Sequence, residues 1–171
     1  GIALNFPVAE AKFFTTFTLM AMVATYGLGV FLIPKYITQA FALKASAALG
    51  IVLSFCIVFS SGFTSVLFVA ALGISNALVW PAIWPLTLKG LGKFTKTASA
   101  LLIMAISGGA VIPPLYGKLV DSNKADYIAQ GMSEALATAN ASTKGYWILL
   151  PCYIIILYYA IAGHKLGLKK K

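Results

Sequence analysis

The sequence predicts an all-α, polytopic membrane protein with five transmembrane helices. Hydrophobic residues make up 60% of the 171 residues, charged residues make up 10%, and the mean hydropathy is +0.91. A soluble domain of this size could not bury so much apolar surface, so the chain is expected to lie in lipid. Five apolar segments stand between charged or turn-forming stretches. The predicted spans are residues 13–33, 45–60, 63–88, 97–117 and 146–163.

The first span is closed by Pro34 and Lys35. At about 1.5 Å per residue, a helix of this length crosses a hydrocarbon core of about 30 Å. The next uncharged stretch, residues 45–88, is about twice as long as one crossing needs. Its turn-forming run Ser60-Ser61-Gly62 divides it into two antiparallel spans.

Residues 118–145, between the fourth and fifth spans, form the one long polar connection. Within it, Ile128, Met132 and Leu136 recur every four residues, which predicts a short amphipathic helix lying on the membrane or on the protein. Residues 164–171 form a basic tail after the last span.

Lysine is the only strongly basic residue type in the chain, and its distribution predicts the orientation of the spans. Five crossings place four lysines and all four acidic residues on one side. The other side carries nine lysines and no acidic residue: Lys35, Lys44, Lys89, Lys93, Lys96, Lys165, Lys169, Lys170 and Lys171. Cytoplasmic loops are rich in lysine, so the tail is expected inside, with Gly1 and the 118–145 link outside. Lys35, Lys89, Lys93 and Lys96 then anchor the helix ends at the cytoplasmic surface.

The sequence lacks the residues that several functional classes require. Without arginine, and with lysines beside apolar runs, the charge of +9 does not favour nucleic-acid binding. His164 is the only histidine, and the sequence contains no metal-binding or phosphate-binding motif, so no enzyme activity, metal or cofactor is expected. Cys56 and Cys152 lie in apolar runs and are interpreted as small buried hydrophobic residues.

The candidate solute site lies on the third span, in the stretch SNALVWPAIWPL. Asn76, Trp80 and Trp84 recur every four residues and share one helix face. Pro81 and Pro85 each remove a backbone donor, so this face should border neighbouring helices or a wet cavity. Asn76 either pairs with a hydroxyl on a facing helix or faces a cavity, where it binds a polar solute while an indole stacks on it. Sugars suit the second arrangement.

Two other spans contribute weaker candidates. In SGGAVIPPLYG, Gly108 and Gly109 permit close helix packing and Pro113 weakens the helical hydrogen bonds above them. Tyr26 of the first span offers a hydroxyl to the interior. No Asp, Glu, Lys or His lies inside a span. Because buried carboxylates are the usual proton carriers of coupled transporters, any coupling residue must lie elsewhere.

Three stretches carry a resemblance to a known family: FLIPKYITQAFALKASAALG (31–50), SNALVWPAIWPLTLKGLGKFTKTASALLIMAISGGAVIPPLYGKLVD (75–121) and YWILLPCYIIILYYAIAGHKLG (146–167). Together they resemble the fucose permease and glucose/galactose transporter branch of the major facilitator superfamily. The charged loop signature of the wider superfamily is missing, because GVFLIPKYITQ contains Lys35 but neither its acidic residue nor its arginine.

The resemblance implies that the five spans are helices eight to twelve of a twelve-helix transporter, an incomplete C-terminal half of that fold. It implies hexose or fucose symport by alternating access in a bacterial inner membrane, coupled to a proton or another cation. The helices before residue 1 would then be the missing N-terminal partners of this chain. The alternatives are a complete five-helix structural or assembly subunit and, with less support, a membrane enzyme.

Overall fold

The computed structural model describes residues 8–33 and 35–166, which form helices joined by short turns. Within these residues, five helical stretches are long and apolar enough to cross a membrane, which confirms the predicted class. They consist of α1 (Val8–Leu32); α2 (Gln39–Phe59); α3 (Gly62–Ala77) with α4 (Val79–Leu88); η2 (Gly92–Phe94) with α5 (Thr95–Ala105) and α6 (Gly108–Ala129); and α7 (Glu134–Gly145) with η3 (Tyr146–Ile148), α8 (Leu149–Ile161) and η4 (Gly163–Lys165). Gly1 and the last three lysines lie outside the described residues.

Local sequence explains where the second and third stretches begin. The Thr38 hydroxyl accepts a hydrogen bond from the backbone N–H of Phe41 at 3.2 Å and so caps the start of α2. α2 ends before Ser60, and Gly62 takes a φ of 61°, a left-handed value that costs glycine little. The structure therefore reverses direction at the Ser-Ser-Gly run.

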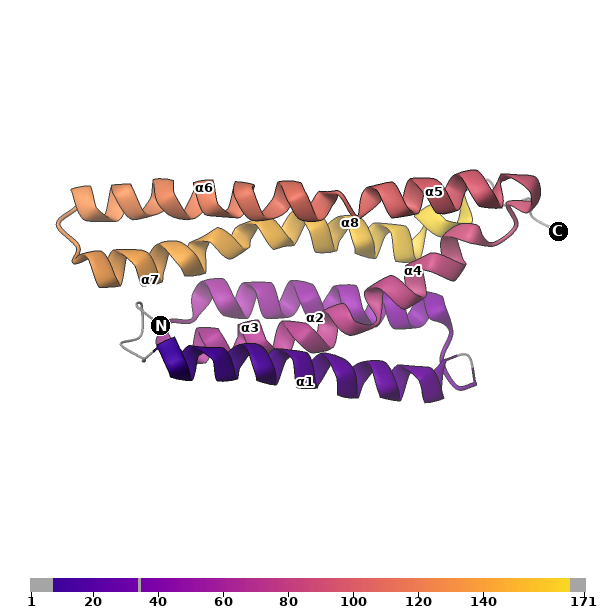
Figure 1. Cartoon of the computed structure of the whole chain (residues 1–171), viewed down its shortest axis with the longest axis horizontal. Coiled ribbons are helices and arrows are strands. Elements are labelled where there is room, and N and C mark those ends of the chain that lie inside the picture. Colours follow the sequence, from indigo (N-terminus) through magenta and orange to yellow (C-terminus); the bar gives the residue numbers. More distant parts are fainter. Residues whose placement is uncertain (1–7, 34, 167–171) are drawn as a thin grey trace.

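Helix α2 makes the most extensive contacts in the packed part of the molecule, where it lies beside α3 and α8 (Figure 1). It packs against α3, α8 and α4, while α1 packs on α3. Two buried clusters fill these interfaces. The first contains Leu53, Ile57, Leu72 and Tyr153, and the second contains Leu43, Ala82 and Ala160.

Buried serines let these helices approach closely. Ser75 donates from Oγ to the backbone oxygen of Ser46 at 2.7 Å, which joins α3 to α2. Ser54 donates to the Gly50 oxygen at 2.7 Å, within α2. Small hydroxyl side chains with satisfied hydrogen bonds are typical of helix contacts in membranes, because an unpaired polar group is costly in lipid.

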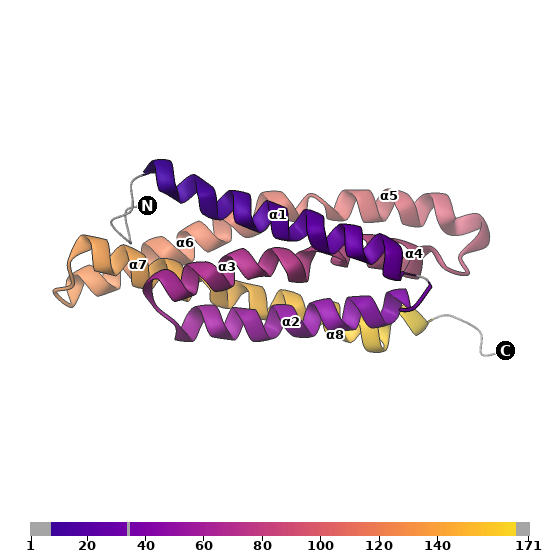
Figure 2. The same ribbon diagram turned by 90° about the horizontal axis from the view of Figure 1, so that it is seen from below.

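Helices α6 and α7 form an antiparallel hairpin that extends past the ends of α1 and α3 (Figure 1, Figure 2). The fourth stretch, from Gly92 to Ala129, contains 38 residues, which is about 57 Å of helix against a hydrocarbon core of about 30 Å. The predicted amphipathic helix is wrong, because Ile128 lies in α6, Leu136 lies in α7, and Met132 lies in the turn between them. Gly131 makes this turn with a φ of 86°.

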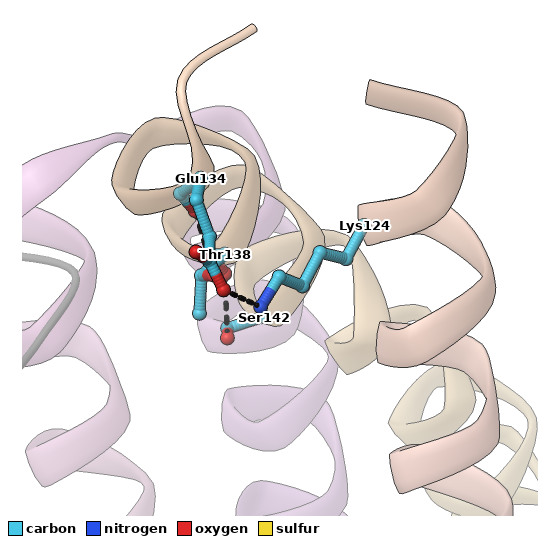
Figure 3. A network of polar contacts seen from close by, with 4 residues as sticks. All are labelled: Lys124, Glu134, Thr138 and Ser142. Atoms are coloured by element: carbon cyan, nitrogen blue, oxygen red, sulfur yellow. Dashed lines mark hydrogen bonds and ion pairs between the residues drawn. The ribbon is translucent and has the colours of Figure 1, made fainter. Parts of the chain in front are cut away.

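Packing and polar contacts hold the hairpin together. A Cβ at Gly145 would lie only 2.7 Å from the ring of Tyr116, so the glycine permits the close approach of α7 to α6. Near the turn, the Lys124 ammonium binds the Glu134 carboxylate at 2.9 Å (Figure 3). This hydrogen bond and the lysine charge hold the pKa of Glu134 below its usual value. Thr138 and Ser142 each donate to a carbonyl one turn earlier in α7.

Candidate functional site

An open cavity of about 620 Å³ lies between α1, the junction of α3 with α4, and α5. Its volume is within the range of about 300–1,000 Å³ that is usual for small-molecule sites. Its lining is mostly apolar, with a few polar groups. The lining residues are Met22, Tyr26, Asn76, Ala77, Trp80, Pro81, Trp84, Pro85 and Ile103.

The helix is interrupted at Leu78, where α3 ends and α4 begins. Pro81 has no N–H to donate to the carbonyl of Ala77, and the next helical bond runs from Ala82 N–H to the Leu78 oxygen at 3.1 Å. Pro81 thereby falls in the first turn of α4, where a missing donor costs little. Pro85 lies inside α4, and both prolines line the cavity.

The two indoles lie one helical turn apart on the cavity wall. Their ring centroids are 5.5 Å apart with the planes tilted by 52°. Trp80 is 45% exposed, and Tyr26 of α1, which is 51% exposed, also lines the cavity. The structure therefore brings together the four candidate residues Tyr26, Asn76, Trp80 and Trp84 from two separate stretches of the chain.

Asn76 pairs with a hydroxyl on another helix and also lines the cavity, while its binding of a solute stays a prediction. Its Oδ1 accepts a hydrogen bond from the Tyr153 hydroxyl of α8 at 2.8 Å, and the residue also lines the cavity. Sequence analysis did not identify Tyr153. The sequence feature that could have identified it is a tyrosine inside an apolar span, because a hydroxyl in lipid needs a hydrogen-bond partner.

The candidate glycines and proline of the fourth stretch do not line the cavity. Gly108 and Gly109 lie at a break around Ile106–Ser107, where four hydrogen bonds to the carbonyl three residues earlier replace the helical pattern. A Cβ at either glycine would meet no described atom within 4 Å. Pro113 lies inside α6 and does not line the cavity. No described helix packs closely against these glycines, so their role in close helix packing stays a prediction.

The candidate anchor lysines gather at one end of the molecule. Lys35 belongs to the connection between α1 and α2, and Lys89, Lys93 and Lys96 belong to the connection between α4 and α5 or to its edge. These two connections and the end of α8 lie at the same end of the bundle, opposite the α6–α7 turn (Figure 1). The side of the membrane to which this end belongs stays a prediction.

Sequence comparison finds relatives among bacterial sugar transporters. A glucose/galactose transporter of Brucella abortus is 33% identical over 131 residues, which are 77% of this chain and 28% of that protein. A putative glucose/galactose transporter of Helicobacter pylori is 34% identical over 93 residues, 54% of this chain and 20% of that protein. An L-fucose-proton symporter of Haemophilus influenzae is 26% identical over 163 residues, 95% of this chain and 35% of that protein. No protein-family model and no solved structure matches the chain.

These relatives confirm the resemblance to the fucose permease and glucose/galactose transporter group. All three are named as transporters or symporters. The chain spans about a third or less of the length of the curated relatives that it matches.

Proposed function

Because this chain is a homologue of bacterial glucose/galactose transporters, we propose that it is the C-terminal part of a secondary active transporter for a hexose or a fucose-type sugar. The observation that carries the proposal is the cavity that Asn76 shares with Trp80, Trp84 and Tyr26. A sugar presents hydroxyl groups at its rim and C–H bonds on its faces. The amide and the phenol suit the first, and the two indoles suit the second.

The open face of the cavity is where the rest of the transporter is expected. Large apolar side chains of α1 and α5 are exposed beside it, among them Val23 at 73% and Ile103 at 57%. We expect the N-terminal helices of the same polypeptide to cover this face and to complete the sugar path. Alternating access would then occur by movement of that half against this one.

Coupling is assigned to residues outside this chain. The predicted spans contain no ionisable Asp, Glu, Lys or His, and one relative is named a proton symporter. A proton is therefore the proposed coupling ion, and its carrier belongs to the N-terminal half.

The charge asymmetry supports an orientation in a bacterial inner membrane. The end that contains Lys35, Lys89, Lys93 and Lys96 is proposed to face the cytoplasm, and the α6–α7 turn is proposed to face outward. A reporter that is active only in the cytoplasm should be active when it is fused after Lys171. Activity of an export-dependent reporter at that position would contradict this orientation.

Uptake by vesicles that contain the complete gene product tests the proposed function. Labelled galactose, glucose and fucose are the substrates. Asn76→Ala removes one neutral hydrogen bond to the sugar, of about 0.5–1.5 kcal/mol, so KM should rise about two- to tenfold. Trp80→Ala should have an effect at least as large, because it removes a stacking surface.

Asn140→Ala is the matched control for the amide. Asn140 lies on α7, where its Nδ2 contacts the sulfur of Met132 at 3.4 Å, so this variant removes the same group far from the cavity. It should leave KM unchanged. Unaltered uptake of all three sugars by Asn76→Ala and Trp80→Ala would remove these residues from the sugar site.

A further inference from the structure

Tyr153 occupies a fixed position in the core behind the cavity. It lies on α8, is 4% exposed, and packs in the cluster with Leu53, Ile57 and Leu72. A Cβ at Gly50 of α2 would lie 2.3 Å from the tyrosine ring, so the ring lies directly against the α2 backbone. The ring therefore has little freedom to move without displacing α2 or α8.

The hydroxyl of this ring binds one end of the Asn76 side chain. It donates to Oδ1 at 2.8 Å, across a separation of 77 residues in the sequence. A carboxamide has an accepting oxygen end and a donating nitrogen end, and a hydrogen bond to one end fixes the direction of the other. Within residues 8–33 and 35–166, the nitrogen end of Asn76 has no hydrogen-bond partner.

We propose that Tyr153 is a positioning residue that holds the Asn76 amide with its N–H groups directed to the sugar. Tyr153 does not line the cavity, so it acts through Asn76 rather than by contact with the sugar. The inference rests on the proposed function, because it assigns a role within the same sugar site. Because Tyr153 is held rigidly, it restricts rotation of the Asn76 amide before a sugar binds. The entropy cost of ordering the amide on binding is therefore smaller.

This arrangement also determines which sugar atom Asn76 recognises. Tyr153 takes one of the two acceptor positions of Oδ1, and both N–H groups stay free to donate, so we expect them to bind a sugar hydroxyl or ring oxygen that accepts. One deoxy sugar, lacking that acceptor, should therefore be taken up with a raised KM by the parent protein. The same deoxy sugar should show a smaller penalty in variants in which the amide is absent or free to rotate.

Tyr153→Phe is the direct test, carried out on the complete gene product in vesicles. It keeps the ring against Gly50 and removes only the hydroxyl, so the amide is free to rotate. KM for the best of the three sugars should rise about two- to tenfold, the effect of one hydrogen bond, while the maximal rate stays within about twofold. Tyr158→Phe is the matched control, because Tyr158 lies on the same helix and is 61% exposed. It should change neither parameter.

Asn76→Ala provides the background that separates positioning from general stability. In that background Tyr153→Phe should raise KM by less than about twofold, because the group on which it acts is gone. Gly50→Ala is a second variant, which keeps the hydroxyl but displaces the ring, and it should also raise KM. Unfolding midpoints of all variants, measured in detergent, show whether the chains are folded.

The outcomes distinguish the inference from the proposed function. If Asn76→Ala raises KM but Tyr153→Phe does not, the positioning role is wrong and the sugar site stands. If Tyr153→Phe raises KM equally with and without Asn76, the tyrosine acts through the fold and the positioning role is again wrong. If Asn76→Ala leaves KM unchanged for every sugar, the proposed site itself is wrong.

Discussion

Gly73 lets α3 approach α1 closely, because glycine has no Cβ at this contact. A Cβ at this position would lie 2.6 Å from the backbone oxygen of Thr18 and 3.0 Å from the side chain of Met22. A backbone atom cannot move aside as a flexible side chain can, so α1 and α3 would have to separate. Because Met22 also lines the cavity, this contact positions one wall of the candidate site.

Gly73→Ala should therefore destabilise the protein by about 1–3 kcal/mol, the usual cost of overpacking. Thermal unfolding of the complete gene product in detergent measures the change. Gly27→Ala is the control within α1, because a Cβ there would meet no described atom within 4 Å. An unfolding midpoint of Gly73→Ala equal to that of the parent would show that α1 does not pack on α3 in this way.

Individual residues differ in how far the sequence could identify them. The spacing of Asn76, Trp80 and Trp84 alone predicts that they share one face, because all three follow one helical periodicity. Tyr153 could not be paired with Asn76 in this way, since 77 residues separate them and they meet only because α3 and α8 both pack on α2. The shared cavity with Tyr26 depends in the same way on the packing of α1 on α3.

At the scale of helices, hydropathy identified the apolar stretches but not their full length. Residues 118–145 are polar, so hydropathy gave no reason to continue a helix through them. Their helices are held by tertiary contacts, such as the close approach of Gly145 to Tyr116 and Val120. The prolines indicated disturbed helices, and the break at Leu78 lies just before Pro81. The break at Ile106–Ser107 lies several residues before Pro113, so the prolines did not predict its position.

The α6–α7 hairpin carries a prediction about pH. The pKa of Glu134 is lowered by Lys124, so this ion pair stabilises the folded state at pH values above the usual carboxylate pKa. The contribution is lost as the pH falls through the lowered value. Lys124→Met should return the pKa of Glu134 toward its usual value, as a pH titration followed by NMR of the labelled glutamate would show.

Because Glu134 is fully exposed, the same substitution should have little effect on stability at neutral pH. Lys118→Met is the control, since this lysine belongs to the same helix but forms no ion pair among the described residues. An unchanged pKa of Glu134 in Lys124→Met would contradict the hairpin contact seen in Figure 3.

At the scale of the whole molecule, the chain is proposed to form one wall of a passage, because its candidate cavity is open rather than enclosed. No residue of α5 or α6 is buried among the described residues, and Ile103 of α5 lines the cavity. The central claim is that Asn76, Trp80 and Trp84 border a hydrophilic passage instead of lipid. That claim explains why an amide and two prolines lie within a span, since all three are costly in hydrocarbon.

Cysteine accessibility tests this claim most directly. In the complete gene product with Cys56, Cys152 and any cysteine outside this chain replaced by serine, single cysteines are introduced at Asn76, Trp80 or Trp84. A membrane-impermeant thiol reagent, which reacts with the thiolate in water, is added to both sides of open membranes. Ile154→Cys and Ile155→Cys on α8, at positions that are 56% and 66% exposed and do not line the cavity, are the controls that we expect to face lipid.

The account predicts that cysteines at the three cavity positions react at least about tenfold faster than those at the α8 controls, and that a transported sugar slows the reaction. Labelling at Asn76→Cys and Trp80→Cys no faster than at Ile154→Cys would contradict it, because those side chains would then face lipid.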